Sequence, residues 1–297
     1  MSNNTLRLAF VTVLAALFAA PIFPAQTDSS CPKCAEWNAP QQPFRIFGNT
    51  YYVGTHGISS ILITSDQGHM PIDGSLYAAP QIVDHIRRLG FRIEDVKWIG
   101  NSHVHYDHSG SLAELQHLSG AKVAASPWSA NVLTKTGVGK GDPQFRDQLP
   151  IPLVHGVHVL KDGETLRIGS LAITAHFTPG HTPGGTSWTW RSCESDRCMS
   201  IVYSDSLTSV SSYGFRYSDQ PAAVQGFQKS FAFLRAASCD ILLTAHPEFS
   251  GLWTRLKRRD SGQPDAMIDT QACKVLADRS EDQLRQRLAS EQKSSQP

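Results

Sequence analysis

The chain of 297 residues has almost no excess of either charge, with 27 basic and 26 acidic residues. Proteins that bind nucleic acid normally carry a basic stripe, so nucleic acid is not an expected partner. Charged residues make up 18% and hydrophobic residues 40% of the chain, which are ordinary values for a globular protein. Internal repeats, domain linkers and low-complexity segments are lacking as well. The length therefore fits one large α/β domain with a sizeable core.

The sequence also lacks an apolar run long enough to cross a membrane comfortably, which takes about 20 residues. The longest run, residues 8–20, follows Arg7 and precedes small residues that end at Ala25. This pattern is typical of a secretory signal peptide. We predict that residues 1–25 are removed on export to the periplasm and that residues 26–297 form the mature domain. We expect no contact of this domain with a membrane.

Cysteine is scarce, with six residues, and in an exported chain these indicate disulfides rather than a metal cluster. Cys193 and Cys198 flank a polar loop between two strand-like runs, so we expect them to join a hairpin. Cys239 and Cys273 are the next pair that we expect to form a disulfide.

Cys31 and Cys34 form a C-x-x-C motif, and the sequence contains no second one. A structural zinc site needs four ligands, which this motif alone does not supply. A thioredoxin-like site would stand at the start of a helix, whereas this motif lies just after the predicted leader. We expect either a local disulfide or two free thiols here.

Short strand-like runs and helical patterns fill the chain between residues 44 and 288. Turn signals at residues 48–49 and 66–68 predict two hairpins near its start. Apolar residues at helical spacing, closed by Gly90, predict the helix that follows. The expected strands are residues 44–47, 50–53, 58–64, 69–72, 96–100, 122–125, 157–160, 166–168, 171–177, 187–191, 199–203 and 241–244. The expected helices are residues 82–89, 112–118, 127–134, 222–236 and 270–288.

The order of these elements bears on the fold class. Two strand-rich halves with helices outside them favour a four-layer αβ/βα sandwich of the α/β class over a strictly alternating doubly wound sheet. Residues 136–156 are rich in Gly, Pro and Asp, as in long loops that cover a site. Ser109 or Ser111 is expected to cap the helix at residues 112–118.

The densest group of metal-binding side chains is residues 101–110, where His103, His105, Asp107 and His108 fall together. Histidines are rarely grouped in a core, and a buried carboxylate is costly unless it is paired or bound to metal. Neutral imidazole and carboxylate are, however, ligands of divalent zinc. In an extended segment His103 and His105 point the same way, while Asp107 and His108 lie past it. The spacing therefore allows two neighbouring metal sites and argues against a chance polar loop.

Two further histidines stand at the ends of strand-like runs. Two Pro-Gly pairs around His181 predict a sharp, exposed turn that presents the imidazole to a cleft. His246 follows the apolar residues 241–244, and Pro247 cannot continue that strand. The total is five histidines and one aspartate, which gives three ligands for each of two metal ions and leaves positions open for water and substrate. A structural site would be closed by four protein ligands, so we expect a catalytic site, with zinc favoured over iron or manganese.

Several segments carry a resemblance to a known family. Residues 103–108 (HVHYDH) with residues 180–182 (GHT) resemble the signature of the metallo-β-lactamase superfamily. Residues 180–188 (GHTPGGTSW), 203–208 (YSDSLT) and 243–247 (LTAHP) narrow this to the class B β-lactamases and, within them, to the third subclass. The resemblance covers nearly the whole mature chain and implies the metallo-β-lactamase fold.

The resemblance also implies a ligand set for two zinc ions. In this subclass the second ion has no cysteine ligand, and disulfides like the two predicted above occur. Some relatives pair an N-terminal cysteine with one at the position of His56, so Cys31 and Cys34 lack that partner here. The first zinc would bind His103, His105 and His181, and the second would bind Asp107, His108 and His246.

The implied activity is hydrolysis of the β-lactam amide bond in penicillins, cephalosporins and carbapenems, which confers antibiotic resistance. Zinc lowers the pKa of bound water to about 7, so a metal-bound hydroxide would attack the carbonyl. Asp107 would be the catalytic residue that binds metal and orients this water, while the second zinc would hold the substrate carboxylate. Ser206, in place of a cysteine ligand, and Thr208 would contact the substrate; alternatively both are ordinary turn residues. We expect a monomer with a small-molecule substrate.

Three other functions compete with this interpretation. A glyoxalase II-like thioesterase or a lactonase of the same superfamily would bridge its metals with an aspartate, and Asp205 stands beside Ser206. A serine β-lactamase is suggested by S-x-x-K at residues 30–33 and K-T-G at residues 135–137, but no Ser-Asp-Asn lies between them. A non-catalytic zinc-binding module would require closed coordination.

The other histidines are not assigned to metal. His85 and His117 fall on predicted helices and are expected to face solvent. His176 lies in a predicted strand, where it would be a core residue with a hydrogen-bond partner or a support for a ligand. The turn at Asp73 and Gly74 is a second candidate support, because metal-bound histidines commonly donate their other nitrogen to a carboxylate.

Overall fold

The computed structural model describes residues 31–135, 139 and 141–293. The predicted signal peptide, residues 1–25, lies outside the described residues, as do residues 136–138 and 140 of the predicted loop. Within the described part, the strands form two sheets of seven and five strands.

The first sheet has the strand order β1-β2-β3-β4-β5-β6-β7. Its first four strands pair antiparallel, as two hairpins in succession require, and the remaining pairs are parallel. The hairpin turn at Gly48 has a φ of 50°, a left-handed conformation that favours glycine. The strands are β1 Phe44–Phe47, β2 Thr50–Tyr52, β3 Ile61–Ser65, β4 Gly68–Ile72, β5 Trp98–Gly100, β6 Lys122–Ala125 and β7 His158–Val159.

The second sheet has the order β12-β11-β10-β9-β8. Its pairs are antiparallel except for β11 with β12, which are parallel because the helix α6 (Pro221–Ala236) connects them. The strands are β8 Thr165–Ile168, β9 Leu171–Phe177, β10 Thr186–Glu194, β11 Arg197–Ser204 and β12 Ile241–Thr244.

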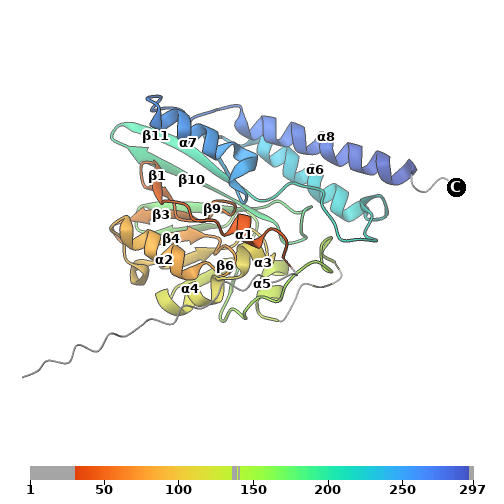
Figure 1. The fold of residues 1–297 in the computed structure, drawn as a ribbon, viewed down its shortest axis with the longest axis horizontal. Coiled ribbons are helices and arrows are strands. Elements are labelled where there is room, and N and C mark those ends of the chain that lie inside the picture. Colours follow the sequence, from red (N-terminus) through yellow and green to blue (C-terminus); the bar gives the residue numbers. More distant parts are fainter. Residues whose placement is uncertain (1–30, 136–138, 140, 294–297) are drawn as a thin grey trace, which may run out of the picture.

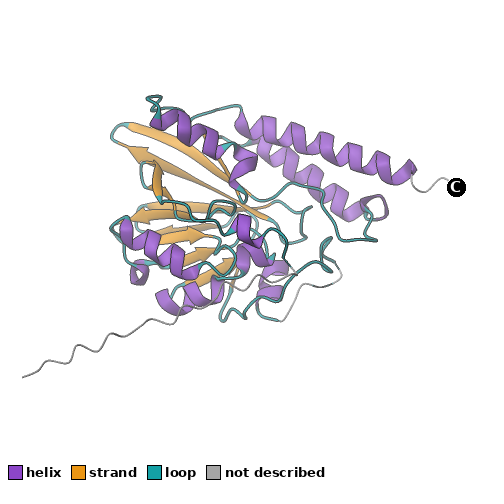
Figure 2. Ribbon diagram, viewed as in Figure 1, coloured by secondary structure: helices purple, strands orange, loops and turns teal. Residues whose placement is uncertain are grey.

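The helices cover the outer faces of both sheets. Figure 1 shows α2, α4 and α5 on one outer face and α6, α7 and α8 on the other. Figure 2 shows the strands enclosed between these two helical layers. The predicted four-layer αβ/βα sandwich is therefore confirmed. The other helices are α1 Cys34–Trp37, α2 Ala79–Arg88, η1 Ile93–Asp95, α3 Tyr106–Ser109, α4 Leu112–Ser119, α5 Pro127–Leu133, η2 Tyr217–Asp219, η3 Pro247–Ser250, α7 Leu252–Asp260 and α8 Ala272–Lys293.

The core lies in three apolar layers, one between the sheets and one beneath each helical layer. The layer between the sheets contains the fully buried rings of Trp188 and Tyr203 from the second sheet and Tyr52 from the first. Large aromatic side chains supply much of the buried apolar area in such a layer. This packing fixes the relative position of the strand ends that carry the histidines.

Local predictions around the helices were partly wrong. Ser111 precedes α4 but makes no capping bond to it. Its hydroxyl instead accepts hydrogen bonds from the amides of Ala78 and Ala79, 2.7 and 3.1 Å away, and so caps α2. His85, predicted to face solvent, is buried, because this side of α2 faces the residue that follows β2: Nδ1 of His85 lies 2.9 Å from the carbonyl of Val53. The helices α1, α3 and α7 were not predicted, and α8 extends past the expected end at residue 288.

All six cysteines are paired. Cys193–Cys198 closes the β10–β11 hairpin, and Cys239–Cys273 joins the segment before β12 to the start of α8, as predicted. Cys31 and Cys34 form a local disulfide with each other, which decides between the two alternatives for the C-x-x-C motif.

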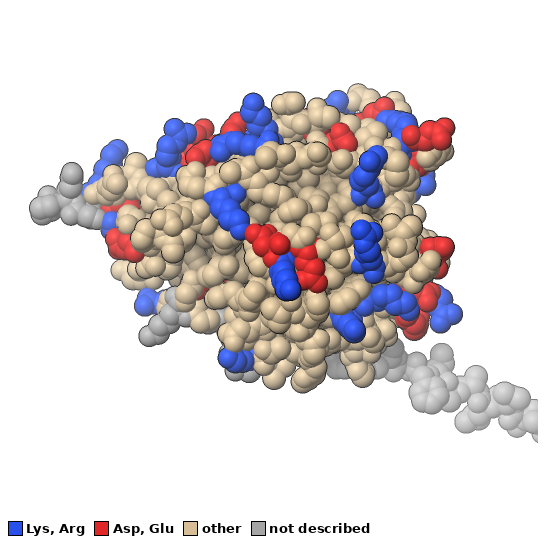
Figure 3. Space-filling model, turned by 180° about the vertical axis from the view of Figure 1, so that it is seen from behind, with Lys and Arg blue, Asp and Glu red and all other residues tan. Residues whose placement is uncertain are grey.

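The surface agrees with the balanced composition. On the face shown in Figure 3, acidic and basic side chains are interspersed among a large area of other residues. None of the helices in the described part of the chain combines the length and apolar character that a bilayer-spanning helix needs.

Candidate metal centre

The histidine motif begins where β5 ends, in the middle of the first sheet. Two hydrogen bonds hold the turn after this strand. Asn101 Nδ2 and Ser109 Oγ both donate to the carbonyl of His103, at 2.7 and 3.0 Å. The extended run stops at His105, and the helical turn α3 carries Asp107 and His108. The predicted division of the motif into two pairs is therefore present in the backbone.

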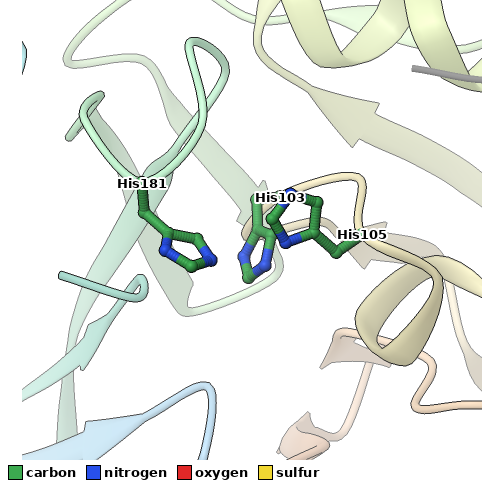
Figure 4. Close-up of side chains that lie close together, drawn as sticks. All are labelled: His103, His105 and His181. Atoms are coloured by element: carbon green, nitrogen blue, oxygen red, sulfur yellow. The ribbon is translucent and has the colours of Figure 1, made fainter. Parts of the chain in front are cut away.

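His103, His105 and His181 form the first group of possible metal ligands. Each offers a nitrogen atom, and the three atoms lie within 4.8 Å of one another. Their ring centroids are 4.6 to 5.0 Å apart. In Figure 4 the rings converge from two segments, the loop after β5 and the turn between β9 and β10. The prediction of an exposed turn was wrong: His181 is 6% exposed and the following Thr182 is fully buried.

Each ring of this first group is held by its other nitrogen. Nδ1 of His103 lies 2.7 Å from Oδ1 of Asp205, and Nδ1 of His181 lies 2.8 Å from the carbonyl of Thr208. Nε2 of His105 lies 3.1 Å from both oxygens of Asp142. Outer partners of this kind fix the tautomer and orientation of metal-bound imidazoles. Nε2 of His103 is buried and has no hydrogen-bond partner among the described residues.

Asp107, His108 and His246 form the second group. Oδ2 of Asp107 lies 3.3 Å from Nε2 of His108 and 3.3 Å from Nε2 of His246. The two imidazole nitrogens are themselves 3.3 Å apart. A tetrahedral zinc site with bonds of about 2.0–2.1 Å separates neighbouring ligand atoms by about 3.3–3.4 Å. The three atoms therefore have the spacing of one face of such a site.

The two groups adjoin each other through His103. Its ligand atom also lies within 4.8 Å of those of Asp107 and His108, and its ring centroid is 4.3 Å from that of His108. Of these two histidines, His246 completes the tighter triangle with Asp107 and His108, with all three distances at 3.3 Å. His103 has its own closely packed partners in the first group.

Burial and mutual contacts shift the pKa values of these side chains in opposite directions. Burial and the neighbouring histidines hold the pKa of His103 well below its usual range, and burial together with His105 lowers that of His181 to about 3. Burial alone would lower the pKa of His108, but Asp107 and Asp73 outweigh it and raise the value to about 10. His103 and His181 therefore offer neutral imidazoles, whereas the surroundings of His108 stabilise its positive charge.

Asp73 supports the second group from behind, as its position in the Asp73-Gly74 turn suggested. It is fully buried and has a φ of 63°. Its carboxylate accepts hydrogen bonds from the amide and hydroxyl of Ser102 and the hydroxyl of Tyr203, at 2.6 to 2.7 Å. Oδ2 lies 3.6 Å from Nδ1 of His108. The left-handed backbone, which aspartate tolerates better than most residues, aims the carboxylate at this ring.

A cavity of about 300 Å³ opens above both groups. Its walls include His105, Asp107, His181 and His246 from the two groups. A larger hollow of about 570 Å³, beside Arg255, contains no histidine or cysteine and lies elsewhere on the chain. The smaller cavity is therefore the candidate site.

Comparisons with known proteins agree with this geometry. The metallo-β-lactamase superfamily matches residues 53–194. The structure of the Rm3 metallo-β-lactamase is 50% identical, covers 88% of this chain and 99% of its own, and superposes with a TM-score of 0.86. MEM-A1, a subclass B3 metallo-β-lactamase from a soil metagenome library, is 48% identical over 87% of this chain and 100% of its own, with a TM-score of 0.85. This chain belongs to the subclass B3 metallo-β-lactamases.

A curated relative gives a coarser match. A probable metallo-hydrolase of Burkholderia pseudomallei is 32% identical over 108 residues, which cover 36% of this chain. The chain spans about a third of that relative, 34% of its length. This match concerns the superfamily and adds nothing on the subclass.

For a B3 metallo-β-lactamase, the question left open by the sequence is which of two neighbours faces the cavity. Asp205 is buried and its Oδ1 is directed to His103, whereas Ser206 lines the cavity. Thr208 also lines it, with its carbonyl on Nδ1 of His181 and its hydroxyl oxygen 3.1 Å from the same nitrogen. The structure thus brings both predicted substrate contacts to the cavity wall.

The two glycines after Pro183 explain part of the GHTPGGTSW motif. A Cβ on Gly184 would lie 2.3 Å from Oγ of Ser129. A Cβ on Gly185 would lie 2.4 Å from both Oδ2 of Asp205 and the carbonyl of Thr178. Only glycine lets the backbone pass this close to Asp205. The motif therefore brings the turn that carries His181 next to Asp205, which contacts His103.

Sequence reasoning missed several residues of the site. Asp142 lies behind His105, and Lys33 and Gln144 line the cavity. Lys33 stands inside the C-x-x-C motif, which was interpreted only through its cysteines. Asp142 and Gln144 stand in the long loop, where the composition predicted proximity to a site without indicating any particular side chain.

Proposed function

We propose that this chain hydrolyses the amide bond of β-lactams, including penicillins, cephalosporins and carbapenems, with two zinc ions, and so confers antibiotic resistance. The observation that carries the proposal is the triangle of Asp107, His108 and His246 donor atoms beside the cluster of three histidines. Both groups open into one cavity of about 300 Å³, a size suited to a small molecule. Each group supplies three protein ligands, which leaves positions for water and substrate.

The residues fit zinc by several independent criteria. The unpartnered Nε2 of His103 is a buried ring nitrogen with no hydrogen-bond partner in the described part of the chain, which a metal ion would supply. The lowered pKa values of His103 and His181 keep these two imidazoles neutral, as metal ligands must be. Four buried carboxylates contact these histidines, and a bound cation would stabilise carboxylates in such a buried place; they are Asp73, Asp107, Asp142 and Asp205.

The ions would be held by His103, His105 and His181 in one site and by Asp107, His108 and His246 in the other. Bound zinc acidifies water near neutral pH and polarises a carbonyl oxygen. The histidines are all used as ligands, so none is left as a general base in the described site. Asp107 is held ionised, because His108 and His246 outweigh the burial that would raise its pKa. With Oδ2 committed to these rings, its Oδ1 would accept a hydrogen bond from the reacting water and orient it.

The substrate would lie along the cavity wall formed by Ser206 and Thr208. The hydroxyl of Ser206 would contact the reacting water and the substrate, and that of Thr208 would donate to the substrate carboxylate, a group that all three substrate classes carry. For this, the Thr208 hydroxyl would turn from His181, whose Nδ1 keeps the carbonyl of Thr208 as its acceptor.

One contact argues against the alternative of a glyoxalase II-like thioesterase or a lactonase. Those enzymes would use an aspartate after the third histidine as a bridge between the metals. Here Asp205 is directed to Nδ1 of His103, on the side of that ring away from its free nitrogen. The serine at the next position faces the cavity instead.

The proposal is tested by comparing substrates on the zinc-loaded protein. We expect hydrolysis of a carbapenem and of a penicillin, loss of both activities in EDTA, and recovery with zinc. S-lactoylglutathione and a simple lactone should be hydrolysed far more slowly. No turnover of any β-lactam, or turnover that persists in EDTA, would contradict the proposal.

We also infer that the protein is exported to the periplasm and acts there as a monomer. The leader-like residues 1–25 support export, as do three disulfides, which persist in oxidising compartments. A periplasmic fraction that contains a chain shortened near Ala25, by mass spectrometry, is the expected result. Full-length protein in the cytoplasm would contradict it.

A further inference from the structure

A buried carboxylate outside the sequence motifs lies behind the first histidine group. Asp142 is fully buried in the loop between α5 and β7, with both oxygens 3.1 Å from Nε2 of His105. An imidazole N–H donates a hydrogen bond and a carboxylate oxygen accepts one, so this contact favours the tautomer of His105 that carries its ring proton at Nε2. Nδ1 of His105 is then the unprotonated nitrogen, available to the space shared with His103 and His181.

The same carboxylate organises the chain that lines the cavity. Oδ1 of Asp142 accepts a hydrogen bond of 2.7 Å from the amide of Gln144, and its carbonyl accepts one of 3.2 Å from the amide of Phe145. The amide of Asp147 then donates to the carbonyl of Gln144 at 2.9 Å. Gln144, Asp147 and Gln148 all line the cavity. Residues 142–148, hereafter the wall segment, thus start at Asp142, whose side chain and backbone carbonyl both accept bonds from the residues that follow.

Further contacts tie the wall segment to residues 212–213. The amide of Ser212 donates to the carbonyl of Pro143 at 2.9 Å, and the amide of Arg146 donates to the hydroxyl of Ser212 at 3.2 Å. The guanidinium of Arg146 reaches the carbonyl of Tyr213 at 3.2 Å. These bonds join the segment to residues 212–213, whereas Asp142 joins it to the metal-binding motif.

We propose that Asp142 is a positioning residue that couples metal binding by the first histidine group to the placement of the wall segment. This inference rests on the zinc sites proposed above. Metal at Nδ1 of His105 makes the Nε2–H a stronger donor and fixes the ring, which fixes the carboxylate and the backbone bonded to it. By thermodynamic reciprocity, a wall segment in place raises the affinity of the first site for zinc.

Hydrogen–deuterium exchange of the unmodified protein tests the coupling directly. We expect zinc to slow exchange of the amides of Gln144, Phe145 and Asp147, which are bonded within the wall segment. Zinc should leave the amides of α2, residues 79–88, unchanged. Equal exchange in the wall segment with and without zinc would overturn the proposal, and this measurement needs no variant.

Asp142→Asn tests the role of the side chain. Asparagine carries no negative charge, and its Nδ2–H2 donor would replace Oδ2, which lies 3.1 Å from the Nε2–H of His105. Zinc affinity at the tighter site should therefore fall about 10- to 100-fold by chelator competition. The effect of zinc on exchange in the wall segment should disappear as well. Asp147→Asn is the matched control, since it makes the same change at an exposed carboxylate of the same segment and should leave zinc affinity unaltered.

The outcomes separate a positioning role from a merely structural one. A folded Asp142→Asn protein with the zinc affinity and zinc-dependent exchange of the unmodified protein would refute the inference. A loss of affinity of equal size in Asp147→Asn would also refute it, because any change in the wall segment would then suffice. Neither measurement uses a β-lactam, so failure of β-lactam hydrolysis alone would refute the proposed function and leave this inference standing.

Discussion

The two ligand groups differ in what stands behind them. Each histidine of the first group is held by an interior partner: Asp205 directly after β11, the carbonyl of Thr208, or Asp142. In the second group His246 is 15% exposed, and its Nδ1 lies 3.3 Å from the carbonyl of Gly57, in a loop near the N-terminal segment. A preorganised site spends less free energy on ordering its ligands. The first group should therefore bind zinc more tightly than the second.

The support of His246 continues into the N-terminal segment. The ring of Trp37 lies 5.5 Å from that of His246, and the carbonyl of Trp37 accepts hydrogen bonds from Gly57 and Thr55. Trp37 ends the short helix α1, which begins at the Cys31–Cys34 disulfide. The first group therefore depends on residues held by the sheets and the interior, whereas the second group depends partly on the disulfide-bonded N-terminal segment around α1.

The largest loss of activity is expected for His103→Ala, because His103 belongs to the first group and its ligand atom also lies close to those of Asp107 and His108. Loss of several kcal/mol of transition-state stabilisation corresponds to a decrease of about 10³-fold in kcat/KM. Steady-state hydrolysis of a β-lactam measures it, with His117→Ala on the exposed face of α4 as the control. A decrease below tenfold would show that the first group is not essential to the reaction.

A smaller loss of activity than for His103→Ala is expected for His246→Ala, which removes one proposed ligand of the second group and leaves the first group intact. Zinc content should fall from two ions to one at stoichiometric zinc, and kcat/KM should fall about 10²-fold, a barrier increase of about 2.7 kcal/mol. Native mass spectrometry and kinetics measure the two quantities. If two ions stayed bound with unchanged affinity, His246 would not be a ligand.

Replacement of both Cys31 and Cys34 by serine should weaken the second site through α1 and Trp37. We expect a loss of tenfold or less in affinity for the weaker ion, below the 10- to 100-fold typical for a direct partner of a metal-bound histidine. Chelator competition measures it. Serine at Cys193 and Cys198 is the control, since that disulfide closes the end of the β10–β11 hairpin remote from Asp205. Equal losses in both double variants would contradict a specific link.

The smallest effect on metal binding is expected for Glu291→Gln at the end of α8. This buried carboxylate accepts hydrogen bonds from the amides of Tyr217 and Ser218, at 3.2 and 2.8 Å, and pairs with Arg287. Loss of its charge should lower the free energy of unfolding by about 1–2 kcal/mol. Zinc affinities should stay the same, because neither ligand group contacts Glu291.

The difference in the free energy of unfolding between the unmodified protein and Glu291→Gln should decrease at low pH. Burial would raise its pKa, but Arg287 and the two amides outweigh burial and lower the pKa below its ordinary value of 4.5. The folded state therefore binds the proton less readily, and the stabilisation is complete above pH 4.5 and shrinks as the pH falls further. Thermal unfolding of zinc-free protein and variant measures it, with exposed Glu114→Gln as control. A constant difference down to pH 3 would contradict the assignment.

What the sequence predicted follows from local rules. His103 to His108 stand together in the sequence, and His181 and His246 follow strands that an apolar run predicts, so the sequence alone suggests all six proposed metal ligands. The layered fold and two disulfides follow from the same strand and turn patterns. These features depend on neighbours in the chain or on the order of elements.

What the sequence missed depends on contacts between distant segments. Asp142 reaches His105 across 37 positions, and Ser111 caps a helix 32 positions earlier. The burial of His85 follows from how α2 lies on the first sheet, which no helical periodicity shows. The sequence does not show whether Asp205 or Ser206 faces the cavity for the same reason, since the answer depends on which of the two side chains contacts His103.

Zinc titration of the metal-free protein tests the central claim most directly, with bound metal followed by native mass spectrometry and β-lactam hydrolysis followed in parallel. The account predicts two ions per chain that bind in two resolved steps, with the second step absent in His246→Ala and hydrolysis dependent on zinc. Binding of a single ion, or of two ions in one unresolved step that His246→Ala leaves unchanged, would contradict it.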